Sequence, residues 1–183
     1  NFEPLHQAFA GITGSQLYRW MQSRRFCGGC GAKTEPSLKE RALVCPSCGQ
    51  TEYPKISPAV IVAITNGDKL LMSRYARGAY RNYALIAGFV EIGETFEDCV
   101  RREVMEKVGL RVKNTRYYKS QPWAFSDTEM VGFTAELDGD DTICLEEEEL
   151  CEAGWFTRDE IVEYGPYISV GHEMMKAFKD GRI

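Results

Sequence analysis

The chain has 183 residues, of which 44% are hydrophobic and 27% charged, and its net charge is −5. This length can bury one core or two small ones, and the composition excludes a disordered chain. An acidic chain is poorly suited to sequence-independent nucleic-acid binding, which depends on neutralising many phosphates. The sequence shows no apolar run of the roughly 20 residues that a membrane-spanning helix needs, and no signal peptide. We therefore predict a cytoplasmic protein without membrane contact.

Residues 1–26 have the character of the end of a larger unit. Leu17, Trp20 and Met21 are spaced as on one face of a helix, which predicts a short amphipathic helix over residues 13–25. The chain does not begin with Met, and we expect this segment to be the end of a missing upstream domain.

Residues 27–54 are rich in Cys, Gly and Pro and contain two Cys-x-x-Cys pairs separated by fourteen residues. Each pair places two thiolates on one tight turn, and the glycine that follows lets the backbone wrap around a metal. Four thiolates complete a tetrahedral shell without an open position, so we predict a structural zinc site. A redox pair or two chance pairs would not explain the shared trailing glycine and the spacing. The predicted zinc ligands are Cys27, Cys30, Cys45 and Cys48.

Residues 55–183 alternate between predicted strands and helices. The β-branched run at 58–65 predicts a buried strand, and Asn66-Gly67 predicts a hairpin turn before a partner strand at 69–73. Further strands are expected at residues 112–120, 129–137 and 153–156, and further helices at 157–164 and 169–179.

Residues 88–110 read GFVEIGETFEDCVRREVMEKVGL. Thr95 and Gly109 are the predicted N-cap and C-cap of a helix, and Glu103 and Glu106 project from one side of it. Clustered carboxylates repel one another unless hard cations lie between them, and oxygen ligands suit Mg²⁺ or Mn²⁺. Such ions polarise phosphate oxygens and activate water. A solvated acidic helix face is the alternative, but it does not explain the glycine-bounded loop before the helix.

This stretch resembles the Nudix box, which is Gly, five residues, Glu, seven residues and then Arg-Glu-apolar-x-Glu-Glu-x-Gly-apolar. The positions that match in register are Gly88, Glu94, Arg102, Glu103, Val104, Glu106, Gly109 and Leu110. The resemblance implies an α+β fold, a Nudix α/β/α sandwich with a mixed sheet, preceded by a small zinc-ribbon domain. It implies Glu103, Glu106 and Arg102 as catalytic residues. The implied ligands of Mg²⁺ or Mn²⁺ are Ala87, Glu103, Glu106 and Glu149.

Position 107 departs from the box. Lys107 stands where the box has its second adjacent Glu, which is a principal metal ligand in Nudix enzymes. A protonated lysine has no lone pair and repels a metal ion. Three outcomes are open from the sequence. The remaining carboxylates hold enough metal for reduced turnover, the ammonium occupies part of the metal site and binds phosphate, or the chain is inactive, naturally or by engineering.

Residues 120–128 read SQPWAFSDT and resemble the SQPWPFPxS segment of the NADH pyrophosphatase family, in which a zinc ribbon directly precedes the Nudix domain. Ala124 and Ser126 replace prolines, which leaves another nucleoside diphosphate derivative open as substrate. The resemblance implies that Phe89 and Trp123 stack on a flat ring of the substrate. The implied substrate-binding residues are Glu40, Tyr53, Phe89, Gln121, Pro122, Trp123, Ala124, Phe125, Ser126, Asp127 and Thr128.

The resemblance implies hydrolysis of the pyrophosphate bond of NAD(H) to nicotinamide mononucleotide and AMP, and removal of NAD caps from RNA 5′ ends. It implies a homodimer, structural Zn²⁺ and catalytic Mg²⁺ or Mn²⁺. One alternative is a Nudix hydrolase for another nucleoside diphosphate derivative. Another is a catalytically impaired protein that binds NAD(H) or RNA ends, which Lys107 keeps open. A zinc-ribbon interaction protein would leave the Nudix box unexplained.

Overall fold

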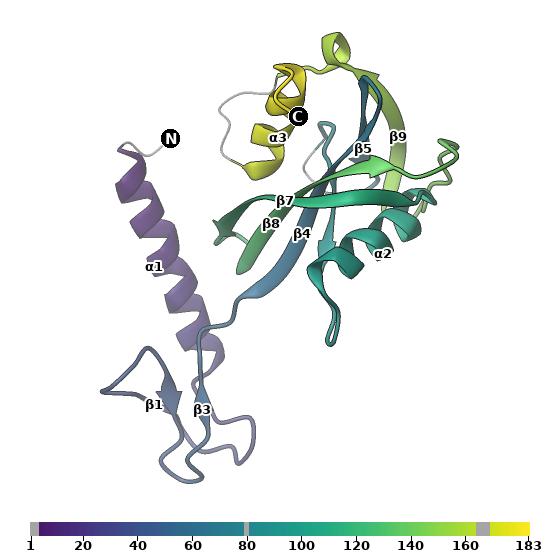
Figure 1. Ribbon diagram of the computed structural model, residues 1–183. Helices are drawn as coiled ribbons and strands as arrows, with labels where there is room; N and C mark the ends of the chain where they lie inside the picture. The colour runs from purple at the N-terminus through teal and green to yellow at the C-terminus, as the bar shows by residue number, and fades with distance from the viewer. Residues whose placement is uncertain (1–3, 79–80, 164–168) are drawn as a thin grey trace. The chain divides into compact units, whose positions relative to one another are not determined.

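The computed structural model of the protein describes residues 4–78, 81–163 and 169–183. Backbone contacts divide the chain into two compact units. The first comprises Asn1–Ser57 together with Trp123–Thr128, and the second comprises Pro58–Pro122 together with Glu129–Ile183. Each unit has its own secondary structure, which Figure 1 labels along the chain.

The first unit begins with helix α1, Leu5–Ser23, which is longer than the predicted helix over residues 13–25. Its N-terminal half also follows helical spacing, but Leu5 and Phe9 on that half are exposed. Gly11 lowers the helix propensity of the same stretch, yet the helix continues through it. Trp20 is the buried residue of α1, as its position on the predicted apolar face indicates.

The cysteine-rich segment forms a small antiparallel sheet in the order β1-β2-β3. Its strands are β1 (Glu35–Pro36), β2 (Leu43–Val44) and β3 (Thr51–Glu52). Leu43 on the central strand is buried and pairs with Pro36 on one side and Glu52 on the other. Such short strands bury little apolar surface, so this sheet needs a further source of stability.

The second unit contains a six-stranded sheet in the order β7-β8-β4-β5-β9, with β6 paired to β4. Its strands are β4 (Ser57–Asn66), β5 (Lys69–Tyr75), β6 (Ile86–Phe89), β7 (Val112–Trp123), β8 (Thr128–Leu137) and β9 (Leu150–Thr157). The predicted hairpin forms, but its two turn residues are Gly67 and Asp68, because Asn66 already pairs with Lys69. Gly67 has a φ of 61°, in the left-handed region that favours glycine.

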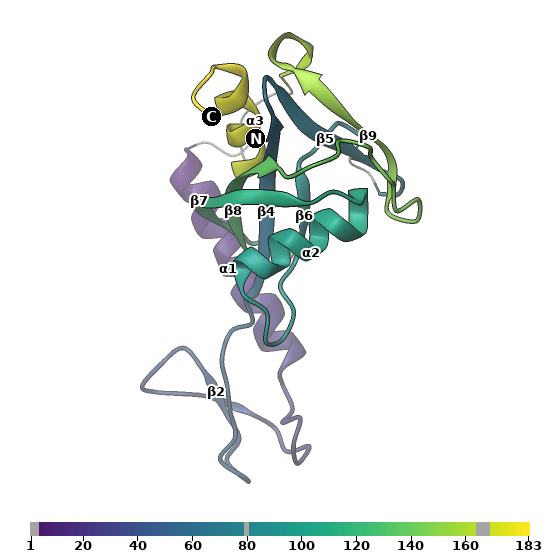
Figure 2. The same cartoon turned by 45° about the vertical axis from the view of Figure 1, so that its right-hand side comes forward.

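The two faces of this sheet carry separate cores. Val60, Val62 and Ile64 of β4 pack in the core with helix α2 (Phe96–Val108). The alternate residue Ala63 packs in the other core, with helix α3 (Val170–Lys179). Figures 1 and 2 show the two helices on opposite faces of the sheet. Burial on both faces explains why β4 reads as a continuous apolar run, and the unit is the α/β/α sandwich that was predicted.

Helix α2 begins and ends at its predicted caps, and α3 begins at the start of the range predicted for it. The Thr95 side chain accepts a hydrogen bond from the Asp98 amide at 3.1 Å, and Gly109 ends α2 with a φ of 69°. The Ser169 side chain accepts from the His172 amide at 3.3 Å at the start of α3. Within the described part of the chain, no helix combines the length and the apolar character needed to cross a membrane.

The prediction of a helix over residues 157–164 is wrong in its extent. Only a single 3₁₀ turn forms, η1 (Arg158–Glu160). The Glu160 carboxylate accepts from the Thr157 amide at 2.8 Å and closes a capping box around this turn. The sequence signal that favoured a helix is therefore satisfied by one turn, and position 164 lies outside the described residues.

Candidate functional site

The cysteine-rich segment contains the same turn twice. In the first copy the Cys27 amide donates to the Ala32 carbonyl at 2.8 Å, and the Gly31 amide donates to the Cys27 carbonyl at 2.9 Å. The second copy repeats this pattern at Cys45 and Gly49, with distances of 2.8 and 2.9 Å. Both glycines have φ near 77°, at 76° and 78°, where other residues are strained. The trailing glycines therefore serve the turn geometry, as predicted.

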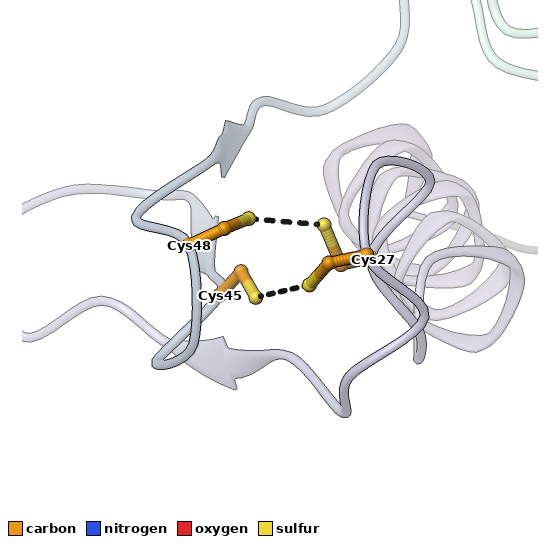
Figure 3. A group of neighbouring side chains, drawn as sticks. Cys27, Cys45 and Cys48 are labelled. Carbon is orange, nitrogen blue, oxygen red and sulfur yellow. Dashed lines mark hydrogen bonds between the residues drawn. The ribbon is translucent and has the colours of Figure 1, made fainter.

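These two turns bring four sulfur atoms together, and Figure 3 shows the side chains facing one space. All four ligand atoms lie within 4.8 Å of one another. The Sγ–Sγ distances are 3.6 Å for Cys27–Cys48 and 3.4 Å for Cys30–Cys45. Tetrahedral Zn–S bonds of about 2.3 Å place sulfurs roughly 3.8 Å apart, so the arrangement fits Zn²⁺. The Cys48 amide donates to the Cys45 thiol and lowers its pKa to about 6. The Gln50 amide lowers the pKa of Cys48, but the neighbouring sulfur atoms outweigh it and raise that pKa to about 12. Four thiolates in this space therefore need a cation between them.

A second candidate site lies in the other unit, where β6 packs against α2. Glu103 of α2 lies directly over Gly88 of β6, and a Cβ at position 88 would overlap the Glu103 carboxylate. Glu103 is only 6% exposed. Glycine is therefore required at position 88 because helix and strand approach closely there, which leaves room for one buried carboxylate.

Arg102 ties the loop before α2 to the helix. Its guanidinium donates to the two Glu94 oxygens at 2.7 and 2.9 Å and to the Phe89 carbonyl at 2.9 Å. It also contacts Glu103 at 2.8 Å and Glu106 at 3.0 Å. The hydrogen bonds from Arg102 lower the pKa of Glu94 to about 2, and the same carboxylate raises the pKa of Arg102. Arg102 therefore positions the loop and the neighbouring carboxylates.

The Lys107 ammonium lies among three oxygen acceptors of the same unit. Its Nζ is 2.8 Å from the Ala87 carbonyl, 2.8 Å from Glu149 Oε2 and 3.3 Å from Glu103 Oε2. The Lys107 side chain is 14% exposed. Burial lowers its pKa, but the hydrogen bond with Glu149 and the charge of Glu103 outweigh burial, and the pKa is raised. The contact with Ala87 is a hydrogen bond, and the contacts with Glu103 and Glu149 are ion pairs.

These acceptors are three of the four predicted ligands of Mg²⁺ or Mn²⁺. The fourth, Glu106, contacts Arg102 instead, and its side chain is 57% exposed. In the ranges that the structure describes, the four cysteines are the one group of His, Cys, Asp and Glu whose ligand atoms converge for a metal. A divalent ion at the position of Lys107 Nζ would have to displace a cation of the protein. The residues as they lie do not fit a divalent ion at that point.

Of the aromatic residues predicted to contact substrate, Trp123 and Phe125 lie at the turn between β7 and β8, in the first unit, whereas Phe89 lies on β6 in the second unit. The ring centroids of Trp123 and Phe125 are 5.0 Å apart, and Phe125 is exposed. Arg19 of α1 donates to the Ala124 carbonyl at 2.6 Å and to Asp127 at 2.8 Å. An ion pair to the helix thus fixes the turn that presents the aromatic pair.

The other predicted substrate residues fall in both units. In the first unit, the Tyr53 hydroxyl donates to Glu40 at 3.1 Å, and the hydroxyls of Ser126 and Thr128 are 2.8 Å apart. In the second unit, Gln121 Oε1 accepts from the Val170 amide at 2.6 Å, at the start of α3. Phe89 and Pro122, also in the second unit, are exposed. The structure therefore brings together Glu40 with Tyr53 and Trp123 with Phe125, within the first unit.

Two residues of these sites were not predicted. Glu94 matches the Nudix box, but no role was inferred for it, and the structure pairs its carboxylate with Arg102, eight residues later. Arg19 has no comparable sequence signal, because its partners Ala124 and Asp127 lie 105 and 108 residues away.

Comparison with known families decides the membership of this chain. The NUDIX domain family matches residues 55–178, which is more than half of the chain. The chain belongs to the NUDIX family. The family described as the NADH pyrophosphatase zinc ribbon domain matches residues 22–53 of this NUDIX protein. The predicted family and the predicted structural zinc site are thereby confirmed, and the NUDIX match supports the predicted use of Mg²⁺ or Mn²⁺.

Curated relatives of this NUDIX protein extend over both matched regions. The NAD-capped RNA hydrolase NudC of Chromobacterium violaceum is 43% identical over 173 residues, covering 94% of this chain and 65% of the relative. The NAD-capped RNA hydrolase NudC of Haemophilus influenzae is 40% identical over 168 residues, covering 90% of this chain and 63% of the relative. The chain therefore spans slightly less than two thirds of the length of these relatives.

Solved structures agree on the fold. A NUDIX hydrolase from Nitrosomonas europaea superposes with a TM-score of 0.73 at 24% identity, covering 86% of this chain and 92% of that chain. The predicted sandwich with a mixed sheet, preceded by a zinc ribbon, is confirmed by this likeness together with the two family matches.

Proposed function

We propose that this NUDIX protein hydrolyses the pyrophosphate bond of NAD(H) to nicotinamide mononucleotide and AMP, with Mg²⁺ or Mn²⁺ as the divalent ion. The observation that supports this most strongly is the 43% identity to a NAD-capped RNA hydrolase along 94% of the chain. That stretch contains the cysteine turns, the loop before α2 and the aromatic turn. NAD-capped RNA 5′ ends are a second substrate in this proposal, because they carry the same pyrophosphate bond.

In this proposal Glu103 and Glu106 are the acidic residues that act on the pyrophosphate, and Arg102 acts with them. The contacts of Arg102 with Glu94 and both carboxylates support a positioning role for it. The Ala87 carbonyl and Glu149 complete the cation site of the domain. The Lys107 ammonium lies 2.8 Å from both the Ala87 carbonyl and the Glu149 carboxylate.

The proposed substrate contacts rest on the aromatic turn and on similarity. Trp123 and Phe125 offer a partly exposed pair of rings, and flat bases stack well on such surfaces. Phe89 is a second exposed ring. The remaining proposed substrate residues are Glu40, Tyr53, Gln121, Pro122, Ala124, Ser126, Asp127 and Thr128.

We also propose a homodimer, a cytoplasmic location and three segments along the chain. The segments are an N-terminal helical segment over residues 1–26, the zinc ribbon over residues 27–54, and the NUDIX domain over residues 55–183. Resemblance to the NADH pyrophosphatase family supports these proposals.

The test is release of AMP from NADH in the presence of Mn²⁺, measured by chromatography for this chain and its Lys107→Glu variant. We expect the variant to release AMP and reduced nicotinamide mononucleotide in equal amounts, and the parent chain to be slower by roughly tenfold or more. Adding Glu106→Gln to the variant should abolish the release. The substrate proposal is wrong if both proteins are folded and loaded with zinc and neither of them releases AMP.

A second candidate function is binding of NAD(H) or RNA ends without turnover. The observation that favours it is the Lys107 ammonium within the cation site. Binding of NADH by the parent chain, with AMP release only from Lys107→Glu, would support this second function. Metal-dependent AMP release by the parent chain would exclude it.

A further inference from the structure

The cation site of the NUDIX domain already contains a cation of the protein itself. We propose that the Lys107 ammonium is a tethered substitute for a divalent ion, so that the free protein holds its carboxylates together without binding Mg²⁺ or Mn²⁺ at this point. The inference rests on the proposed function only in taking Ala87, Glu103 and Glu149 as the cation site of the hydrolase.

The ammonium connects three separate parts of the second unit. Ala87 lies on β6, Glu103 lies on α2, and Glu149 lies in the turn before β9. The position of Glu149 is fixed independently, because its amide donates to the Glu146 carboxylate at 2.8 Å and its carbonyl accepts from the Ala76 amide at 2.8 Å. Lys107 therefore joins a strand, a helix and a fixed turn at one point, as a metal ion would.

The charges of the site lead to the same inference. Glu94, Glu103, Glu106 and Glu149 contribute four negative charges, and Arg102 and Lys107 contribute two positive charges, which leaves −2. Arg102 contacts three of these carboxylates and Lys107 contacts Glu103 and Glu149, so the cations of the chain lie directly against the negative charges. Changing Lys107 to Glu would alter this local charge by two units, which is the charge of one divalent ion.

Direct binding of phosphate by Lys107 is disfavoured by the same contacts. The ammonium already donates to the Ala87 carbonyl and pairs with the carboxylates of Glu103 and Glu149, so a phosphate oxygen would have to compete with these three contacts. Glu106 remains as an exposed carboxylate. Mg²⁺ is commonly held by one or two carboxylates together with substrate phosphates. A divalent ion used in turnover is therefore expected to bind together with the dinucleotide and not before it.

The test is titration of the zinc-loaded proteins with Mn²⁺ in the absence of any dinucleotide, following the paramagnetic resonance signal of free Mn²⁺. We expect Lys107→Glu to bind Mn²⁺ at least ~10-fold more tightly than the parent chain, because it removes a cation and adds a carboxylate ligand. Lys107→Met removes the cation without adding a ligand, so its affinity for Mn²⁺ should lie between those of the parent chain and Lys107→Glu. Binding by the parent chain within about twofold of Lys107→Glu would overturn the inference.

Thermal unfolding provides a second readout and a matched control. Mn²⁺ at ~1 mM should raise the unfolding temperature of Lys107→Glu and leave that of the parent chain unchanged, because a ligand stabilises only the state that binds it. Lys113 pairs with Asp138 on the surface of the same unit and is 51% exposed, so Lys113→Glu makes the same charge change away from the site. If Mn²⁺ stabilises Lys113→Glu as much as Lys107→Glu, the inference is wrong.

These measurements separate the inference from the proposed function. Neither uses a dinucleotide, so a failure of NADH hydrolysis would leave their expected outcomes unchanged. Tight Mn²⁺ binding by the free parent chain would overturn the inference while leaving hydrolysis of NAD(H) in place.

Discussion

The zinc ribbon and the loop–helix site of the NUDIX domain both bring together groups that repel one another when they are charged. The loop–helix site comprises the carboxylates of Glu94, Glu103, Glu106 and Glu149 together with Arg102 and Lys107. In the ribbon, sulfur atoms lie 3.4 and 3.6 Å apart, and a zinc ion is the cation that can balance four thiolates. In the NUDIX domain, carboxylates gather around Arg102 and Lys107, which are part of the chain. The first site therefore depends on an ion from solution, whereas the second carries its own cations.

The two sites also differ in how the chain builds them. Each cysteine turn is local, with both ligands of a pair three residues apart, and repeated hydrogen bonds fix its backbone. The acceptors around Lys107 come from positions 87, 103 and 149, which only the folded sheet and helix bring together. Loss of the zinc ion should therefore unfold the ribbon locally. Substitutions in the loop–helix site should instead lower the stability of the whole second unit.

The largest expected effect is loss of zinc. Cys45→Ser removes one of four thiolates and should leave the ribbon without its zinc ion and without ordered structure, because short strands alone bury too little apolar surface. Elemental analysis and protease cleavage within residues 27–54 would measure this. Cys144→Ser is the matched control, because Cys144 is exposed and lies outside the cysteine cluster. Retention of zinc and protease resistance by Cys45→Ser would contradict the structural role of the ion.

A smaller effect is expected from Arg102→Lys. A lysine cannot donate to both oxygens of Glu94 and also reach the Phe89 carbonyl, so partly buried acceptors lose their partners. We expect the free energy of unfolding in denaturant to fall by about 2 to 3 kcal/mol. The neighbouring Arg101 is 53% exposed and pairs at the surface with Asp98. Arg101→Lys should therefore change the free energy of unfolding by less than about 0.5 kcal/mol. Equal losses for the two variants would show that Arg102 does not organise the loop.

The smallest expected effect is a pH dependence from Glu94. Arg102 holds its pKa at about 2, below its ordinary value of 4.5. A carboxyl group with a lowered pKa stabilises the folded state above its ordinary pKa, and this contribution is lost as the pH falls towards the lowered value. The difference in unfolding free energy between the parent chain and Glu94→Gln should therefore be constant near neutral pH and shrink below about pH 4.5. A difference that stays constant down to pH 3 would contradict this role of the ion pair.

Much of the fold could be predicted because its signals are local. The β-branched run of β4 indicated a strand buried on both faces, and Thr95 and Gly109 marked the ends of α2. Other local signals gave the wrong extent. The helix predicted over residues 157–164 formed only a single 3₁₀ turn within the described residues, and the exposed first half of α1 was left out of the predicted helix.

The candidate site could be predicted only in part, because the sequence shows local spacing but not the contacts between residues far apart along the chain. The Nudix-box spacing indicated Glu103 and Glu106 on one helix, and the glycine at position 88 was required by the close approach of Glu103. The sequence showed that Lys107 would oppose a metal ion, but it did not show where the ammonium would go. Its partners Ala87 and Glu149 are far apart along the chain, and only the packing of β6 and the turn before β9 decides the contact.

The central claim is that the ribbon needs a zinc ion whereas Lys107 takes the place of a divalent ion in the NUDIX domain. The most direct test is to measure zinc and manganese in the same sample. The zinc-loaded chain and its Lys107→Glu variant would be equilibrated with Mn²⁺, freed of unbound ions and assayed for zinc and manganese by elemental analysis. We expect equal zinc in both proteins and manganese bound only by Lys107→Glu. Manganese bound by the parent chain in the same proportion to zinc as in the variant would contradict the claim that Lys107 takes the place of a divalent ion.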